Sequence, residues 1–301
     1  MSADLNDFRG GAVAVYKPYG ITSHDVVFKM RKLFGTRKVG HTGTLDPMAT
    51  GVLVVLVGRA VKASDLVMAG QKSYRATLKL GVRSDTEDIT GKLEYSNSEM
   101  PESAEVLSVI SSFVGDSMQI PPMYSALKVN GQKLVDLARQ GITVEREARP
   151  ITVYSIEASG SGDTYVIDVE CSKGTYIRTL CADIGEKLGC GAVMSALERR
   201  SSGGFSLADS VKLEELEAMS PEERFSVISP CEKLFSEYPA VVLPDFYAGL
   251  YKNGCEIYQK KIKTCFDTGV LVRVYDGSGF LGIGAVGEYD DGTAIKVKAF
   301  L

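Results

Sequence analysis

One polar loop is the place where this sequence could carry out chemistry. Residues 40–51, GHTGTLDPMATG, contain three glycines and a single carboxylate, Asp46, and they lead into the apolar run Val52–Val57. Glycine lets a backbone approach a ligand closely. An aspartate, with an ordinary pKa of about 3.9, is ionised at neutral pH and can attack an electrophilic carbon without a separate base. Asp46 is therefore a candidate nucleophile, although Asp46-Pro47 is also typical of a helix N-cap, a role that spacing alone favours.

Other common catalytic motifs are absent from the sequence or lack their structural context. Residues 277–282 fit the pattern G-x-G-x-x-G, but residues 283–289 look like a strand and not like the helix that faces a phosphate. There is no P-loop, H-E-x-x-H or G-x-S-x-G motif. With two histidines and no C-x-x-C pair, a zinc site is poorly supplied. We expect no metal site and six reduced, structural cysteines.

Short strands and one helix must position the loop. Before it, residues 12–16 predict a strand, and Thr22 or Ser23 can cap a helix that ends at Gly35. After it, residues 52–57 predict a strand that is buried on both sides, because every residue is apolar. Residues 74–80 alternate between apolar and polar side chains and predict a half-buried strand.

The rest of the chain continues this mixture of helices and strands. Apolar residues at helical spacing predict helices at 106–114, 134–138 and 177–188. Residues 151–156 and 165–171 predict a hairpin through the intervening Gly-Ser-Gly-Asp. We therefore predict an α+β fold.

The C-terminal 64 residues, 238–301, have a different texture. Short alternating runs are separated by Asn-Gly, Asp-Gly and Ser-Gly pairs, which is typical of a small β-rich domain. The domain boundary is expected near residues 230–239.

Composition and charge limit the function classes. A chain of 301 residues with 45% hydrophobic and 24% charged residues has the balance of a soluble globular protein. No apolar stretch approaches the ~20 residues of a bilayer span, and the polar N-terminus differs from a signal peptide, so we expect a cytoplasmic protein without membrane association. The net charge is −4, but residues 26–45 contain five basic and no acidic residues. A polyanionic partner is admissible, and a solvated helix face explains these basic residues equally well.

The loop HTGTLDPMATG resembles the signature loop of the TruB family of pseudouridine synthases, bacterial enzymes that act on uridine 55 in the T-loop of tRNA. Further stretches resemble that family's motifs in the same order: Lys17-Pro-Tyr-Gly20, Lys72-Ser-Tyr-Arg75, Tyr124-Ser-Ala-Leu-Lys128, Arg146-Glu-Ala-Arg-Pro-Ile151 and Ser172-Lys-Gly-Thr-Tyr-Ile-Arg178. The resemblance implies a catalytic domain at 1–237 built on a mixed, mainly antiparallel sheet. It also implies an RNA-gripping thumb at about 121–150 and a PUA-like RNA-binding domain at 238–301.

The resemblance assigns four residues to catalysis. Asp46 would be the nucleophile, and Arg178 would hold its carboxylate ionised and oriented. Tyr74 would stack on a uracil flipped out of the loop, and Tyr176 would lie against that base. The implied reaction is an isomerisation, in which the glycosidic bond breaks and a C–C bond forms, and it needs no cofactor.

Four other residues would bind the substrate. By the same resemblance His41 would help to displace the flipped base, Lys17 and Lys62 would contact phosphates, and Leu197 would line the pocket. From the residues alone, Leu197 would be a core residue of a helix. Glu198 departs from the family pattern, in which further basic or threonine residues follow, and it puts a phosphate role of this stretch in doubt. The implied partner is the T-arm of tRNA, bound by a monomer.

Two other functions remain open at this point. A non-catalytic tRNA-binding or tRNA-folding protein would use the same basic surfaces without needing Asp46. A metabolic enzyme with a small substrate would show no salt-sensitive affinity for RNA, whereas phosphate contacts make such affinity fall steeply with salt.

Overall fold

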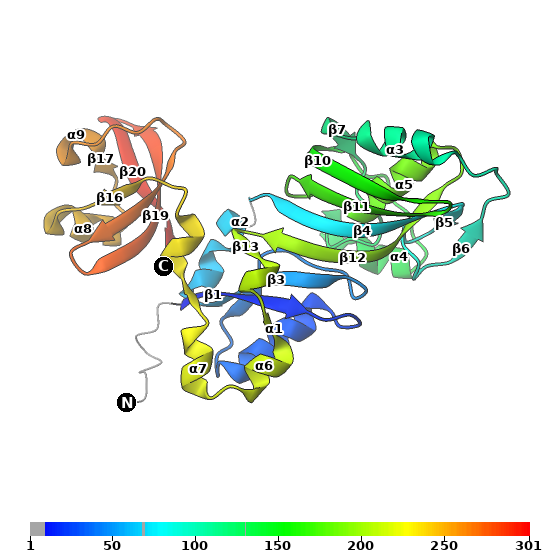
Figure 1. Cartoon of the computed structure of the whole chain (residues 1–301). Coiled ribbons are helices and arrows are strands. Elements are labelled where there is room, and N and C mark those ends of the chain that lie inside the picture. The colour runs from blue at the N-terminus through cyan, green and yellow to red at the C-terminus, as the bar shows by residue number, and fades with distance from the viewer. Residues whose placement is uncertain (1–9, 68–69, 130) are drawn as a thin grey trace.

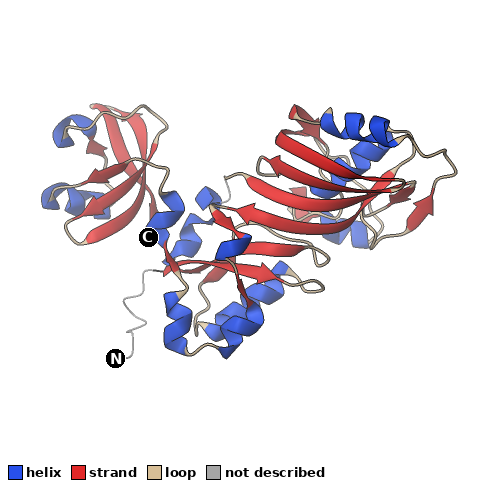
Figure 2. Cartoon of the chain, viewed as in Figure 1, coloured by secondary structure: helices blue, strands red, loops and turns tan. Residues whose placement is uncertain are grey.

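A computed structural model describes residues 10–67, 70–129 and 131–301. Within these residues the strands gather into a sheet of eleven strands and a separate sheet of five (Figures 1 and 2). The strands of the larger sheet are β1 (Gly10–Lys17), β2 (Val39–His41), β3 (Thr50–Gly58), β4 (Lys72–Leu80), β7 (Gly115–Gln119), β10 (Arg149–Ser161), β11 (Thr164–Cys171), β12 (Ala192–Ser202), β13 (Phe205–Ser206), β14 (Val211–Lys212) and β15 (Ser229–Pro230).

The larger sheet has the order β14-β1-β3-β12-β4-β11-β10-β7, with β2, β13 and β15 paired at its sides. Its pairs are antiparallel except β1 with β14 and β3 with β12, which are parallel. Two short hairpins stand apart from it, β5 (Val82–Ser84) with β6 (Leu93–Tyr95) and β8 (Lys128–Val129) with β9 (Gln132–Lys133). The predicted α+β class and the mixed, mainly antiparallel sheet are confirmed.

Short helices flank this sheet. They are α1 (Ser23–Leu33), α2 (Ser64–Val67), α3 (Ser103–Ser111), α4 (Leu134–Arg139), α5 (Ile177–Lys187), α6 (Leu213–Ala218) and α7 (Pro221–Ser226), with 3-10 turns η1 (Arg59–Ala63), η2 (Leu207–Asp209) and η3 (Cys231–Phe235). The helices predicted in residues 23–35, 106–114, 134–138 and 177–188 all form.

Helix α1 illustrates why the local sequence folds as it does. Thr22 accepts a hydrogen bond from the main chain of Asp25, whose carboxylate accepts one from the Thr22 main chain in return, so two free donors of the helix end are satisfied. Val26, Val27 and Met30 are buried together with Leu53 and Val55 of β3. The alternate residues of β3, including Val54, pack on the opposite side of the sheet, which confirms the prediction of a strand buried on both faces.

Strand β12 contradicts one expectation. Residues 192–202 form a strand, not a helix, and Leu197 lies opposite Ala76 in the antiparallel pairing of β12 with β4. Glu198 lies opposite Arg75 and Arg199 opposite Tyr74. Because side chains alternate between faces of a sheet, Leu197 and Arg199 share the face of Tyr74, and Glu198 points to the other face.

The C-terminal part forms the five-stranded sheet, in the order β16-β18-β19-β20-β17. Its elements are β16 (Ala240–Val242), α8 (Asp245–Lys252), β17 (Ile257–Tyr258), α9 (Gln259–Ile262), β18 (Leu271–Asp276), β19 (Gly279–Tyr289) and β20 (Gly292–Phe300). The β-rich texture is thus correct, whereas α8 and α9 escaped prediction. The G-x-G-x-x-G stretch runs into β19 and has no helix after it, as expected for a motif that does not bind a nucleotide.

An apolar cluster joins the two sheets. Ile283, Ala299 and Leu301 of the C-terminal part pack in one cluster with Ala12 of β1 and Val54 of β3. The smaller sheet, at the left of Figure 1, therefore packs against the larger one.

The charged surface is partly neutralised within the chain. Lys29, on the basic helix α1, forms an ion pair at 2.8 Å with Glu217 of the acidic helix α6. The ion pair with Glu217 therefore accounts for the charge of Lys29 without a polyanionic partner. Across the described residues, no helix has the length and apolar character needed to cross a bilayer.

Candidate active site

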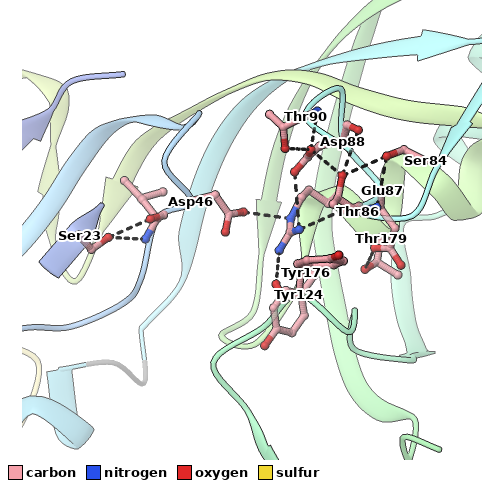
Figure 3. Close-up of polar contacts among 12 residues, drawn as sticks. Ser23, Asp46, Ser84, Thr86, Glu87, Asp88, Thr90, Tyr124, Tyr176 and Thr179 are labelled. Atoms are coloured by element: carbon pink, nitrogen blue, oxygen red, sulfur yellow. Dashed lines mark hydrogen bonds and ion pairs between the residues drawn. The ribbon is translucent and has the colours of Figure 1, made fainter. Parts of the chain in front are cut away.

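Asp46 lies in the loop between β2 and β3 and does not cap a helix. The residues after it form a turn in which the Ala49 main chain donates to the Asp46 carbonyl at 3.0 Å, and the chain then enters β3. The carboxylate points to α5, where its Oδ2 lies 3.0 Å from Nε of Arg178 (Figure 3). The N-cap alternative is therefore wrong, because no helix starts at Asp46 and its side chain is used in an ion pair.

The Arg178 guanidinium is held by acceptors on several sides. Its side chain is only 5% exposed, and it donates to the carbonyls of Thr86 at 3.0 Å and Tyr124 at 2.8 Å. Asp88, equally buried, lies 3.6 Å from Nη1 and itself accepts from the Thr90 hydroxyl at 2.6 Å. The planar fork of an arginine can satisfy such a ring of acceptors, whereas a lysine cannot. Arg178 is thus fixed before any substrate binds.

Burial and Arg178 act on Asp46 in opposite directions. Burial raises the pKa of the Asp46 carboxyl above its ordinary value, and the positive charge of Arg178 lowers it. One third of the Asp46 side chain remains exposed. The carboxylate is therefore poorly solvated, oriented by an arginine and open to a substrate, which are the properties of an activated nucleophile.

A buried apolar cluster, called the apolar wall below, includes residues on either side of Asp46 in the sequence. Tyr74 of β4 and Leu197 of β12 are buried in one cluster with Leu45 and Met48 of the catalytic loop, the name used below for residues 40–51. Burial raises the pKa of the Tyr74 phenol, so its ring is neutral at physiological pH. The structure thus brings Tyr74 and Leu197 to the loop that carries Asp46, as expected from the sequence.

Tyr176 is the N-cap residue of α5, two positions before Arg178. Burial raises the pKa of its phenol, and the positive charge of Arg178 opposes this rise. The hydroxyl is therefore protonated at neutral pH and available as a hydrogen-bond donor.

Lys17 does not occupy the position expected of it. The side chain is completely buried, and its ammonium donates to the carbonyls of Pro18 at 2.9 Å, Pro47 at 3.2 Å and Ala49 at 2.7 Å. Burial lowers its pKa to about 8. The expected contact of Lys17 with a phosphate is wrong, because these three carbonyls use all three donors of the ammonium. Lys17 instead binds the main chain of the catalytic loop.

Two residues that the sequence analysis missed also hold this loop. Arg199, 1% exposed, donates to the Gly43 carbonyl at 3.0 Å and to the Val52 carbonyl at 2.7 Å, so it ties together the two ends of the loop. Ser23 donates to the Leu45 carbonyl at 3.0 Å and accepts from the Leu45 main chain at 2.8 Å (Figure 3). The basic stretch after Leu197 was a signal for Arg199. Asp88 had no comparable signal, since it stands in an ordinary polar segment.

His41 and Lys62 keep their expected roles as predictions. His41 is at the end of β2, and its Nδ1 accepts from the Gly43 main chain at 3.3 Å. Burial lowers its pKa, which favours the neutral ring. Lys62 is exposed on η1. Glu198 lies on the far face of the sheet, where it accepts from the Tyr16 hydroxyl at 3.2 Å.

No metal centre is apparent in the part of the chain that the structure describes, because no three His, Cys, Asp or Glu side chains are grouped to hold an ion.

The chain is similar to known proteins over most of its length. Residues 31–177 match the model of the TruB family pseudouridylate synthase N-terminal domain, and residues 178–236 match that of the tRNA pseudouridylate synthase B C-terminal domain. The chain is 46% identical over 277 residues to a tRNA pseudouridine synthase B of Clostridium tetani, covering 91% of this chain and 94% of that one. It is 44% identical to the Alkaliphilus oremlandii protein of the same name, covering 93% and 94%.

Solved structures extend the likeness to the fold. A chain in the crystal structure of a Cbf5-Nop10-Gar1 complex superposes with a TM-score of 0.75 at 26% identity, covering 97% of this chain and 85% of that one. The two family models together match well over half of the sequence. The first match ends and the second begins within the motif that carries Tyr176 and Arg178. The chain therefore belongs to the TruB family of pseudouridine synthases.

Proposed function

We propose that this enzyme converts uridine 55 in the T-loop of tRNA to pseudouridine, with Asp46 as the nucleophile and without a cofactor. Family membership supports a pseudouridine synthase, and the relatives named above are tRNA enzymes. The observation that carries the proposed role of Asp46 is its ion pair with the buried Arg178 at 3.0 Å. A protein that only binds tRNA has no need of an oriented, partly desolvated carboxylate.

The chemistry requires the uridine to leave its stack. The N1–C1′ bond of the nucleoside breaks, the uracil turns, and a C5–C1′ bond forms while C5 loses a proton and N1 gains one. No atoms enter or leave overall, so neither an oxidant nor a group donor is needed. A base within a folded loop cannot present its sugar to Asp46, and we infer that it is flipped out first.

The apolar wall supports this inference. Tyr74 can stack on an extruded base, a contact worth ~1 to 3 kcal/mol, and Leu197 completes the wall. His41 would occupy the space that the flipped base leaves in the RNA loop, and Lys62 would contact a phosphate of the RNA backbone. The thumb at about 121–150 and the PUA-like part at 238–301 would provide the remaining grip on the T-arm.

The decisive experiment is to incubate the pure protein with unmodified tRNA, without cofactor, and to map pseudouridine. We expect product at position 55 with the wild type and none with Asp46→Asn, while the affinity for tRNA changes by no more than a few fold. Asp168→Asn is the matched control, because Asp168 also pairs with an arginine, Arg75 at 2.7 Å, but on an exposed part of the sheet.

Product formation by Asp46→Asn at the wild-type rate would refute the nucleophile. Binding of tRNA with no product from the wild type would favour a non-catalytic binding protein. An affinity that does not change between low and physiological salt would favour a small-molecule enzyme, because phosphate contacts always carry a salt dependence.

A further inference from the structure

A buried glutamine grips the main chain next to the active site. Gln119, the last residue of β7, is 3% exposed. Its Oε1 accepts from the main-chain nitrogen of Tyr176 at 2.8 Å, and its Nε2 donates to the carbonyl of the same residue at 3.0 Å. The side-chain amide thus pairs with one peptide residue in the way that a neighbouring strand would.

The gripped residue starts the helix that carries Arg178. The Tyr176 carbonyl also accepts the first hydrogen bond of α5, from Leu180 at 3.0 Å, and no side chain caps this helix at its N-cap residue. Arg178 lies two residues further, within the first turn. Because one turn of helix is stiff, the position of the Tyr176 main chain determines where the Arg178 side chain begins.

The same segment touches α5 a second time. Five residues after Gln119, the Tyr124 carbonyl accepts from Nη2 of Arg178 at 2.8 Å. Residues 119–124 therefore contact the start of α5 at both ends, once through a side chain and once through a carbonyl. The strand that bears Gln119 is the edge of the large sheet and brings no other described group to Asp46.

We propose that Gln119 is a positioning residue for the reaction. By fixing the Tyr176 main chain it sets the Tyr176 ring and, through the first turn of α5, the Arg178 guanidinium that faces Asp46. This inference rests on the proposed roles of Tyr176 and Arg178. This pair of hydrogen bonds needs one acceptor and one donor on the same side chain, and only an amide of this length supplies both.

Two substitutions distinguish the contributions of the two hydrogen bonds between Gln119 and the Tyr176 main chain. Gln119→Met keeps much of the length and volume of the side chain and removes both hydrogen bonds. Gln119→Glu keeps the acceptor for the Tyr176 nitrogen, but when ionised it places a carboxylate oxygen against the Tyr176 carbonyl and donates nothing.

The chain contains a matched control in its other sheet. Gln259 is also 3% exposed, and its amide grips the main chain of Phe266 in the same way, with Oε1 accepting at 2.7 Å and Nε2 donating at 2.9 Å. Gln259→Met therefore removes an equivalent pair of hydrogen bonds in the C-terminal part, away from α5, together with a third bond that Nε2 donates to the Thr293 hydroxyl at 3.1 Å.

The test measures single-turnover formation of pseudouridine with enzyme in excess over unmodified tRNA, together with tRNA affinity by filter retention and the thermal midpoint. We expect Gln119→Met to slow the reaction at least tenfold, as expected for a misplaced catalytic group, with an affinity within about threefold of wild type. Gln259→Met should lower the thermal midpoint comparably and leave the rate within about twofold. The single-turnover rate of Gln119→Glu should lie between the rates of Gln119→Met and the wild type.

A pH profile adds a readout that a purely structural role would not move. If Arg178 is displaced in Gln119→Met, it lowers the pKa of Asp46 less, and the acid limb of the rate profile moves to higher pH. A rate near wild type in Gln119→Met, or equal slowing in Gln119→Met and Gln259→Met with unchanged acid limbs, would overturn the proposal. If Gln119→Met fails to fold, Gln119→Glu decides by the same criteria.

The proposed nucleophile is tested separately in the same assay. Product from Asp46→Asn would refute the role of Asp46, whereas loss of product in Asp46→Asn combined with a wild-type rate in Gln119→Met would refute only the role of Gln119.

Discussion

The protonation state of Asp46 depends on two opposing influences, burial and the charge of Arg178. Burial disfavours the charged carboxylate, and the ion pair with Arg178 favours it. Full exposure would leave the carboxylate fully solvated, whereas burial without Arg178 would raise its pKa further and so favour the protonated form. The partly buried pair permits an ionised carboxylate that is not fully hydrated.

This balance predicts a pH dependence. The proposed nucleophile would react as the carboxylate, so the single-turnover rate should fall as the pH decreases through the pKa of Asp46. Because burial raises that pKa, the acid limb should lie above the ordinary value of 3.8. Arg178→Met should move the limb to still higher pH, because the opposing positive charge is lost, and should lower the plateau. Rate profiles of both proteins over acidic to neutral pH check this expectation, and identical acid limbs would contradict it.

At the scale of elements, the catalytic loop is held at several points. Lys17 of β1, Ser23 of α1 and Arg199 of β12 each bond to its main chain. The loop joins β3 at Gly51, whose φ is +100°, and a Cβ there would overlap the main chain of Arg199 in the adjacent strand. Glycine at 51 is therefore required both by its own conformation and by the close approach of β12.

We expect Gly51→Ala to destabilise the protein by several kcal/mol and to reduce activity, because the strand that carries Leu197 and Arg199 must move. Gly35→Ala is the matched control. Gly35 also has positive φ, +61°, but its Cβ would meet nothing within 4 Å, so only the conformational cost of about 1 to 2 kcal/mol applies. Urea denaturation measures both free energies of unfolding. Equal losses in the two variants would show that the contact with β12 is unimportant.

At the scale of the whole molecule, the two sheets share one apolar cluster and are not independent. Ile283 of β19 is fully buried in the cluster that contains Ala12 and Val54 of the larger sheet. Apolar surface on both parts is therefore covered only while they are packed together, and this links the stability of the C-terminal part to that of the catalytic sheet.

Ile283→Ala should cost about 2 to 5 kcal/mol, as is typical for a buried isoleucine, and should lower the stability of both sheets in a single transition. Val242→Ala on β16, where Val242 is 68% exposed, should change stability by less than about 0.5 kcal/mol. Thermal unfolding followed by circular dichroism and by loss of tRNA binding tests this expectation. Two separate transitions in Ile283→Ala would contradict the shared cluster.

Elements with local sequence signals could be predicted before the structure was known. The cap at Thr22 and the apolar spacing of α1 predicted that helix, and the uninterrupted apolar run of β3 predicted burial on both faces. The glycines and single carboxylate of residues 40–51 indicated a candidate loop for chemistry, and the structure places this loop between β2 and β3. These features were readable because hydrogen bonding and hydrophobic periodicity act between residues that are near in sequence.

Contacts between residues that are far apart in the chain could be seen only in the folded molecule. Residues 192–202 contain alanine, leucine, glutamate and arginine, which favour helices, yet pairing with β4 makes them a strand. The family resemblance implied a phosphate contact for Lys17, but in the folded chain its ammonium donates to three main-chain carbonyls. Asp88, Arg199 and Gln119 gain their roles from partners dozens of residues away, and no local pattern encodes such contacts, because they form only when the sheet brings the segments together.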